Sequence, residues 1–131
     1  MTYSGENLKE IIFPLGGIGT GCIGLSGDGR LCDWEIFNRP NKGSYNGYSH
    51  ICVIAETKGK RSVKVLNGDL MKELSGRYSK ARFAGYGFGP DAAAMCGFPH
   101  FKNVVFEGEF PFAKLTFTDG SFPGEVQLTG F

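Results

Sequence analysis

Glycine is the residue that most constrains the fold of this chain, because 21 of its 131 residues are glycine and they are spread along its whole length. A glycine inside a helix costs roughly 1 kcal/mol relative to alanine, so a helical bundle is disfavoured. The glycines follow no three-residue period, which excludes a collagen helix. The chain also has 12 Phe, 5 Tyr and 1 Trp, which bury enough apolar surface to offset the entropy lost on ordering. These features predict one folded domain over residues 1–131.

Apolar residues recur with the period of two that is typical of strands, and no long window has a convincing helical period. Residues 113–118 and residues 62–66 alternate apolar and polar side chains. Residues 104–106 and the region from Val126 onwards predict further strands. Residues 50–56 are apolar on both faces, which predicts a strand buried on both sides. Short strands separated by Gly-, Pro- and Asn-rich turns predict an all-β fold, an antiparallel β-sandwich.

Residues 16–24 are expected to form a packed, glycine-rich strand. They contain Gly-Thr-Gly-Cys-Ile-Gly, which satisfies the G-x-G-x-x-G pattern of dinucleotide-binding proteins. That pattern binds phosphate only where a helix follows it, whereas residues 26–29 read as a turn. Dinucleotide binding is therefore disfavoured, and no cofactor is predicted. Residues 72–81 predict one helical turn or an irregular loop, and residues 84–99 predict a long surface excursion.

The charges of the chain are balanced, with 14 Lys and Arg against 13 Asp and Glu. A net charge of +1 without a basic cluster gives no reason to expect a nucleic-acid partner. No apolar stretch approaches the roughly 20 residues of a transmembrane helix, so no membrane-spanning segment is predicted. Residues 1–10 lack the apolar core of a signal peptide, and we therefore expect a cytoplasmic location.

The four cysteines have no C-x-x-C spacing and, in a chain without a signal peptide, are expected to be small buried residues rather than disulfides. An alternative is a zinc site, because soft ligands recur at short spacing. Its ligands would be His50, Cys52, Cys96 and His100. The structural interpretation is favoured, since residue 52 lies within an apolar strand, and no metal site is predicted.

One pair of carboxylates stands next to an aromatic residue. Asp33 and Glu35 flank Trp34, and an extended backbone would place both carboxylates on one face about 7 Å apart. Glycosidases use two carboxylates roughly 5–10 Å apart, and aromatic rings favour sugars. The alternative is that either carboxylate forms an ion pair with Arg30 or Arg39 nearby. A polar and aromatic patch near a sugar is a weaker expectation than the ion pair, and a complete catalytic pair is weaker still.

Two groups of motifs, taken together, resemble a known family. The first group is Phe-Pro-Leu-Gly-Gly-Ile-Gly-Thr-Gly at 13–21, then Gly-Asp-Gly-Arg-Leu at 27–31 and Trp-Glu-Ile-Phe-Asn at 34–38. The second is Phe-Pro-His-Phe-Lys at 98–102, then Phe-Glu-Gly-Glu-Phe-Pro-Phe-Ala at 106–113. In this order they resemble the N-terminal domain of glycoside hydrolase family 116, the bile-acid β-glucosidase or non-lysosomal glucosylceramidase type.

The resemblance implies a β-sandwich that packs on a C-terminal (α/α)6 barrel. In the family, that barrel carries the Glu nucleophile and the Asp acid/base of a retaining β-glycosidase. No catalytic residue of the family corresponds to a position in this chain. The resemblance therefore predicts a non-catalytic segment that is inactive alone, with the catalytic barrel and a β-glycoside as partners.

The first group of motifs also suggests which residues face the substrate. Trp34, Glu35, Asn38 and Arg39 are the candidate substrate-binding residues, at the rim of the cleft or packed at the domain interface. Relatives continue beyond residues 126–131, so we expect a sandwich that is incomplete at its C-terminal side and self-associates through exposed strand edges. The alternative is a free-standing module that binds carbohydrate or another protein.

Overall fold

The computed structural model describes residues 1–36, 38–42, 49–69 and 97–131, which form nine strands and one 3-10 helix. One sheet has the order β1-β7-β8-β9, and its strands are β1 (Thr2–Ser4), β7 (Asn103–Glu109), β8 (Phe112–Thr118) and β9 (Val126–Gly130). A second sheet contains β2 (Ile12–Leu15), β3 (Cys22–Ser26) and β4 (Leu31–Glu35). A separate hairpin consists of β5 (Cys52–Thr57) and β6 (Lys60–Val65), and the 3-10 helix η1 is Gly5–Glu10. Every strand pair is antiparallel.

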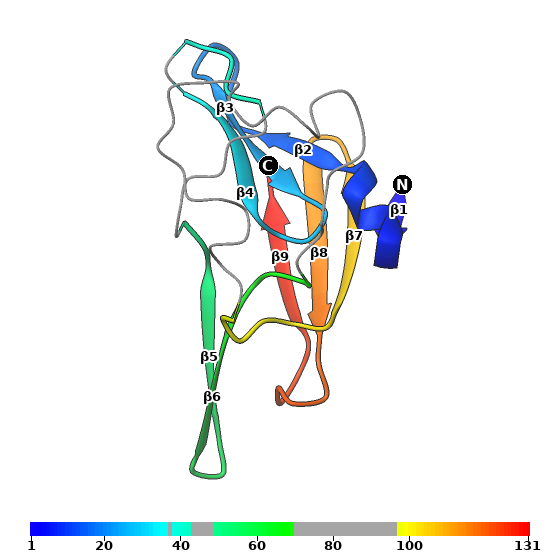
Figure 1. Cartoon of the computed structure of the whole chain (residues 1–131), viewed down its shortest axis with the longest axis vertical. Helices are drawn as coiled ribbons and strands as arrows, with labels where there is room; N and C mark the ends of the chain where they lie inside the picture. The colour runs from blue at the N-terminus through cyan, green and yellow to red at the C-terminus, as the bar shows by residue number, and fades with distance from the viewer. Residues whose placement is uncertain (37, 43–48, 70–96) are drawn as a thin grey trace.

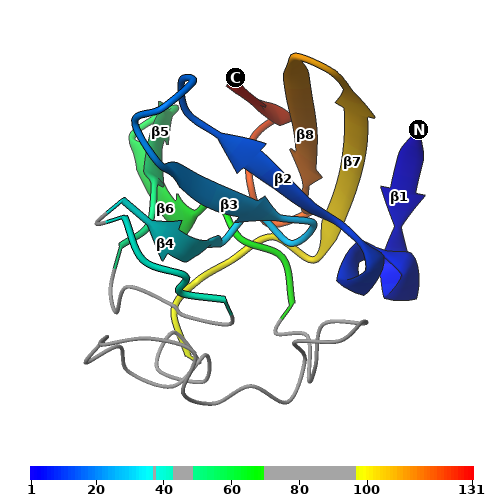
Figure 2. The same cartoon turned by 90° about the horizontal axis from the view of Figure 1, so that it is seen from above.

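The two larger sheets lie across one another with the hydrophobic core between them, and this confirms the predicted all-β sandwich (Figure 2). The alternation predicted for residues 113–118 places every second side chain of β8 in that core. Leu115 and Phe117 have no exposed surface, and Phe106 on β7 pairs with Leu115 and is equally buried. Phe101, just before β7, packs its ring against Phe117 with centroids 5.6 Å apart. The core is thus built from aromatic residues on sequentially distant segments.

The turn between β3 and β4 is buried, although turns usually lie at the surface. The Asp28 carboxylate in this turn accepts hydrogen bonds from the Ser26 hydroxyl and from the Arg30 N–H, and it contacts Arg30 Nε at 3.3 Å. Burial raises the pKa of Asp28, and the contacts with Arg30 and Ser26 oppose that effect. Gly29 has φ +91°, and a Cβ at this position would lie 2.5 Å from Leu66 O. The turn therefore packs directly against the end of β6.

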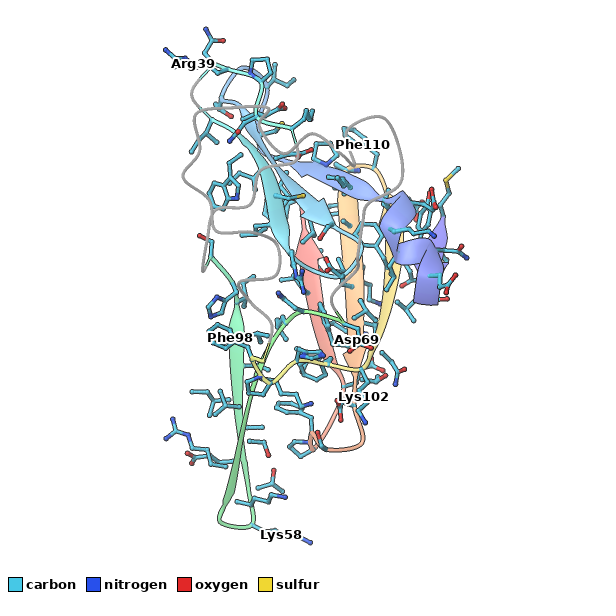
Figure 3. The ribbon with its side chains drawn as sticks, viewed as in Figure 1. Arg39, Lys58, Asp69, Phe98, Lys102 and Phe110 are labelled. Atoms are coloured by element: carbon cyan, nitrogen blue, oxygen red, sulfur yellow. The ribbon has the colours of Figure 1, made fainter. Side chains whose placement is uncertain are left out.

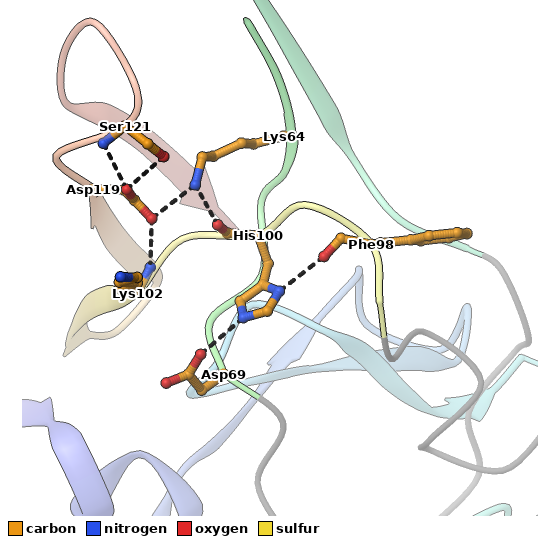
Figure 4. Close-up of polar contacts among 7 residues, drawn as sticks. All are labelled: Lys64, Asp69, Phe98, His100, Lys102, Asp119 and Ser121. Carbon is orange, nitrogen blue, oxygen red and sulfur yellow. Dashed lines mark hydrogen bonds and ion pairs between the residues drawn. The ribbon is translucent and has the colours of Figure 1, made fainter.

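A buried ion pair joins the hairpin to the four-stranded sheet (Figure 4). Lys64 Nζ on β6 lies 2.7 Å from Asp119 Oδ2 and donates to the carbonyl of His100 at 2.6 Å. Asp119 also accepts hydrogen bonds from the N–H and hydroxyl of Ser121, at 2.8 and 2.7 Å, and from the N–H of Lys102 at 3.3 Å. The hydrogen bond from Lys64, followed by those from Ser121, lowers the pKa of the Asp119 carboxyl. Three segments far apart in the sequence are held together here.

The strand predicted at residues 50–56 is present as β5, but the prediction that both of its faces are buried is wrong. Cys52 and Ile54 are exposed, whereas Val53 and Ala55 pack partly against the core. The reason is that β5 pairs with β6 in a hairpin that projects from the sandwich (Figure 1). Apolar residues on both faces of a strand do not reveal how many layers surround it.

The glycine-rich strand predicted at residues 16–24 is also only partly correct. Residues 16–21 form the connection between β2 and β3, and β3 begins at Cys22. Gly16, Gly19 and Gly21 all have positive φ, a backbone conformation that does not continue a strand. A strand rather than a helix follows the G-x-G-x-x-G motif, so the geometry that binds a dinucleotide phosphate is not formed.

Other segments agree with their predictions or lie outside the described residues. The strands predicted at 62–66 and 104–106 are present as β6 and β7, and β7 continues through Gly108 to Glu109. The helical turn predicted at 72–81 and most of the excursion predicted at 84–99 lie outside the described residues. Within the part of the chain that the structure describes, no helix has both the length and the apolar character required to cross a bilayer.

The close approach at Gly29 leads to a first prediction. Gly29→Ala places a side chain against Leu66 O and the Phe117 ring and imposes an unfavourable φ, and we expect a loss of about 2–4 kcal/mol in unfolding free energy. Gly124→Ala is the matched control, because a Cβ there meets nothing within 4 Å, and it should change stability by less than about 0.5 kcal/mol. Urea denaturation of both variants measures this, and equal midpoints would contradict the buried turn.

The ion pair at Asp119 leads to a second prediction. Because its folded-state pKa is lowered, its stabilising contribution is fully present above the unfolded pKa of about 3.9 and is lost as the pH falls below that value. Asp119→Asn should therefore lower the melting temperature at pH 6 and have a smaller effect at pH 2.5, where part of the contribution is already lost. Thermal melts at both pH values test this, with Glu107→Gln, which removes an exposed carboxylate of β7, as the control. A difference between wild type and Asp119→Asn that does not change with pH would contradict the assignment.

Candidate functional site

The acidic residues predicted to form a site lie on β4, and an irregularity in that strand directs their side chains. Cys22 pairs with Glu35, whereas Gly24 pairs with Cys32, so β4 contains one residue more than β3 over this interval. Asp33 lies in the interval with φ +49°. This is a β-bulge, which bends a strand and redirects its side chains. The assumption of a regular extended backbone at Asp33 is therefore wrong, although both carboxylates still reach one common partner.

That common partner is Lys42. Its Nζ lies 3.0 Å from Glu35 Oε2 and 3.5 Å from Asp33 Oδ2. The Asn41 N–H donates to Glu35 Oε1 at 3.2 Å, and the Cys22 thiol donates to Glu35 Oε2 at 3.6 Å. We call these five residues the Lys42 cluster. It fastens the chain that follows β4 back onto the β3–β4 hairpin.

The electrostatics of the Lys42 cluster favour an ionised Glu35 and a protonated Lys42. Burial alone would raise the pKa of Glu35, but the contacts with Lys42 and the Asn41 N–H outweigh burial and lower it. Burial would lower the pKa of Lys42, but Glu35 and Asp33 raise it. The thiol of Cys22 has a raised pKa, because of burial first and of the Glu35 contact second. Glu35 is thus an ionised carboxylate and Cys22 a protonated thiol at neutral pH.

This arrangement is unsuited to glycoside hydrolysis by Asp33 and Glu35. A glycosidase needs one carboxyl group that holds a proton, which requires a raised pKa. Here both carboxylates contact the same ammonium group, and the pKa of Glu35 is lowered. The ion pair was predicted with Arg30 or Arg39. The structure instead places Lys42 between the carboxylates, and the Arg30 side chain contacts Asp28 in the buried turn.

The four sequence-predicted site residues divide into two groups. Glu35 and Trp34 are partly buried at the Lys42 cluster, where the Trp34 carbonyl accepts a hydrogen bond from Asn41 Nδ2 at 3.1 Å. Asn38 and Arg39 are exposed, in the segment that carries Asn41. Asn38 has φ +54°, a left-handed conformation that asparagine tolerates better than most residues. Figure 3 shows Arg39 at one extreme end of the molecule, pointing outward.

Sequence reasoning missed Lys42 and Asn41. The signal was available, because two carboxylates that share a face require a nearby cation or exposure to water. It was not decisive, because three basic residues lie within nine positions of Asp33: Arg30, Arg39 and Lys42. Only the path of the chain after β4 decides among them.

The cysteines occupy three different environments. Cys22, Cys32 and Cys52 are free thiols. Cys32 is fully buried and Cys22 is partly buried, in agreement with the prediction. The prediction is wrong for Cys52, which lies on the exposed face of the projecting hairpin. Cys96 is outside the described residues.

The two histidines both lie next to Phe98. His100 contacts Asp69 Oδ1 through Nε2 and the Phe98 carbonyl through Nδ1, both at 2.8 Å (Figure 4). The His50 ring stacks against the Phe98 ring with centroids 5.6 Å apart. Among the described residues, no group of three or more His, Cys, Asp or Glu side chains is arranged to hold a metal ion. The alternative zinc site includes Cys96 and so lies partly beyond these residues.

Comparison with protein families gives a match over most of the chain. Residues 13–131 match the model of the N-terminal part of glycosyl-hydrolase family 116, described as beta-glucosidase 2. No curated protein matches the chain. The matched range includes the Lys42 cluster, the buried turn and the Lys64–Asp119 ion pair. The chain therefore belongs to glycosyl-hydrolase family 116, of which it represents the N-terminal domain.

Proposed function

We propose that this chain is the non-catalytic β-sandwich segment of a retaining β-glycosidase and supports the (α/α)6 barrel that carries the catalytic residues. The observation that carries the proposal is that Asp33 and Glu35 both form ion pairs with Lys42, and that the contacts with Lys42 lower the pKa of Glu35 and so remove it as a proton donor at neutral pH. Membership of family 116 gives the partner, because the family is that of a β-glucosidase. The role is therefore structural: the sandwich gives the catalytic domain a fixed surface to pack on.

The segment from Asn38 to Lys42 is the proposed contact with that domain. Its inner side is fixed, because Lys42 and Asn41 bind it to β4. Its outer side carries the exposed side chains of Asn38 and Arg39, an amide and a guanidinium of the kind that binds carboxylates, carbonyls or sugar hydroxyls. A segment held in one conformation loses little entropy on binding. We propose that it packs at the domain interface, next to the rim of the sugar-binding cleft.

A free-standing carbohydrate-binding module is the second candidate, and one observation weakens it. Trp34, the sole tryptophan, is partly buried and its backbone is held by Asn41. Sugar-binding platforms present an open aromatic face to the solvent. Packing within the protein therefore accounts for Trp34 better than sugar binding does.

The catalytic part of the proposal is tested with the purified chain. It should release no aryl group from a chromogenic aryl β-glucoside, because Lys42 is paired with both Asp33 and Glu35, the acidic pair beside Trp34. Glu35→Gln should give the same absence of turnover. Hydrolysis by the wild-type chain that is lost in Glu35→Gln would overturn the non-catalytic role.

The structural part is tested by adding the separately expressed catalytic domain of a family 116 β-glucosidase. The two polypeptides should bind each other, and the Asn38→Ala/Arg39→Ala variant should bind roughly tenfold more weakly. Lys58→Ala is the matched control, because Lys58 is equally exposed but lies at the opposite end of the molecule (Figure 3). Calorimetric titration measures the affinities. Equal binding by Asn38→Ala/Arg39→Ala and wild type would exclude this segment from the interface.

A further inference from the structure

The hairpin of β5 and β6 presents an unusual surface to solvent. Cys52, Ile54 and Val63 share its outer face with Glu56 and Arg61, and we call these five residues the outer hairpin face. Ile54 is 53% exposed, and Val63, directly opposite it, is 44% exposed. The outward face of an antiparallel sheet is normally polar. Over most of β8 and β9 that rule holds, with the outward side chains Lys114, Thr116, Thr118, Gln127 and Thr129.

The opposite face of the same hairpin is covered by the protein. Val53 and Ala55 pack partly against the hydrophobic core, and Lys64 is buried in its ion pair with Asp119. Strand β5 is therefore apolar on both faces, although the core covers one of them. A strand that is apolar on both faces is typical of a sheet with a layer on each side. The aliphatic pair of the outer hairpin face has the composition of a buried layer but is half exposed.

The chemistry of the outer hairpin face is complementary to itself. A contact between two copies related by a two-fold axis uses the same surface patch on both, and sheets that pack face to face keep their strands roughly aligned. With the axis along the hairpin, β5 of one copy lies over β6 of the other. Ile54 then meets Val63 of the second copy.

The charges of the face match in the same arrangement. Glu56 and Arg61 lie opposite each other in the hairpin, with Glu56 Oε1 3.7 Å from Arg61 Nε, and their side chains are 71% and 63% exposed. The two-fold axis places Glu56 of each copy over Arg61 of the other. Two copies thus bring opposite charges together twice, and like charges do not meet at these positions.

We propose that the outer hairpin face is a docking surface for a second copy of this chain, which packs its own outer hairpin face against it. The second copy supplies the layer that covers Ile54 and Val63. The hairpin projects from the sandwich, so this face is accessible (Figure 1). Five residues make a small contact compared with the roughly 800 Å² per partner of a standard interface. The dimer is therefore weak, and it forms reversibly as the protein concentration rises.

The proposed contact with the catalytic domain leaves this face free. That contact includes Arg39, whereas the turn of the hairpin, at Lys58, lies at the opposite end of the molecule (Figure 3). The same domain can thus bind the catalytic domain at one end and a second copy at the other. A second copy also brings matching aliphatic and charged groups without any further protein.

The apolar part of the contact is tested by sedimentation equilibrium over a range of protein concentrations. Ile54→Thr/Val63→Thr removes the apolar pair and keeps β-branched side chains, which suit a strand. We expect it to raise the dissociation constant of the dimer at least tenfold. Val105→Thr is the control, because Val105 is 37% exposed on β7, and it should dimerise like wild type. All samples contain a reducing agent, because the Cys52 thiol is exposed on this face.

The orientation of the two copies is tested by reversing charges at low salt, where ion pairs are least screened. Glu56→Arg gives the face two cations, and Arg61→Glu gives it two anions. Each variant alone should dimerise at least fivefold more weakly than wild type. An equimolar mixture of the two should regain the wild-type affinity, because every charge in the mixed dimer again meets its opposite. Damage to the hairpin itself would weaken the mixture as well.

Three results would overturn the proposal. Wild type could sediment as a monomer at every concentration up to its solubility limit. A dimer could persist unchanged in Ile54→Thr/Val63→Thr, or the mixture of charge variants could bind no better than its components, and either result would place the contact elsewhere. A monomeric wild type that loses affinity for the family's catalytic domain on Ile54→Thr/Val63→Thr would make that domain the occupant. Melting temperatures close to that of wild type show that the variants are folded.

Discussion

The arrangement of this domain depends on the buried contact between Lys64 and Asp119. A buried charge is costly unless it is paired and hydrogen-bonded, and here both conditions are met. Asp119 binds the cation and three further donors, and the Lys64 ammonium lies 5.3 Å from the centre of the Phe101 ring. The hairpin, the segment before β7 and the turn after β8 must all be in place before this network closes. The network therefore fixes the relative positions of these three segments, which the non-directional packing of the aromatic core does not do alone.

The fold class could be predicted from the sequence because one strand shows an unambiguous pattern. In β8, the alternation of Ala113, Leu115 and Phe117 with polar residues corresponds directly to an inner and an outer face. Strand β5 shows the limit of that approach, because its apolar residues do not reveal whether a second layer covers them. At residues 16–21, the glycine-rich composition predicted a packed strand. The positive φ angles of Gly16, Gly19 and Gly21 instead produce the connection between β2 and β3. The periodicity of apolar residues indicates the local backbone conformation, whereas contacts between distant segments decide how many layers surround a strand.

The candidate residues could be chosen from the sequence, but the cation that pairs with the two carboxylates could not be identified from it. Trp34 and Glu35 lie at the Lys42 cluster, and the acidic pair is bound to a cation, but that cation is Lys42 and not the Arg30 or Arg39 of the alternative interpretation. The identity of that cation depends on the bulge at Asp33 and on the path of the chain from β4 to Lys42. Neither is encoded in a short motif. Because both carboxylates pair with this cation, they hold the adjacent segment in place rather than act as an acid and a base.

Two of the hairpin turns, β3–β4 and β5–β6, differ in how much change they would tolerate. The turn at Lys58 and Gly59 projects into solvent, and a Cβ on Gly59 would meet nothing within 4 Å. The turn at Asp28 and Gly29 lies inside the protein, with its backbone bonded to Gly68. Added residues, such as an epitope or a fluorescent label, can be accommodated at the first turn because it has no neighbours to displace. The second turn, also short and rich in glycine, has no such freedom, and a change in its length during evolution would have to be accompanied by repacking of the core.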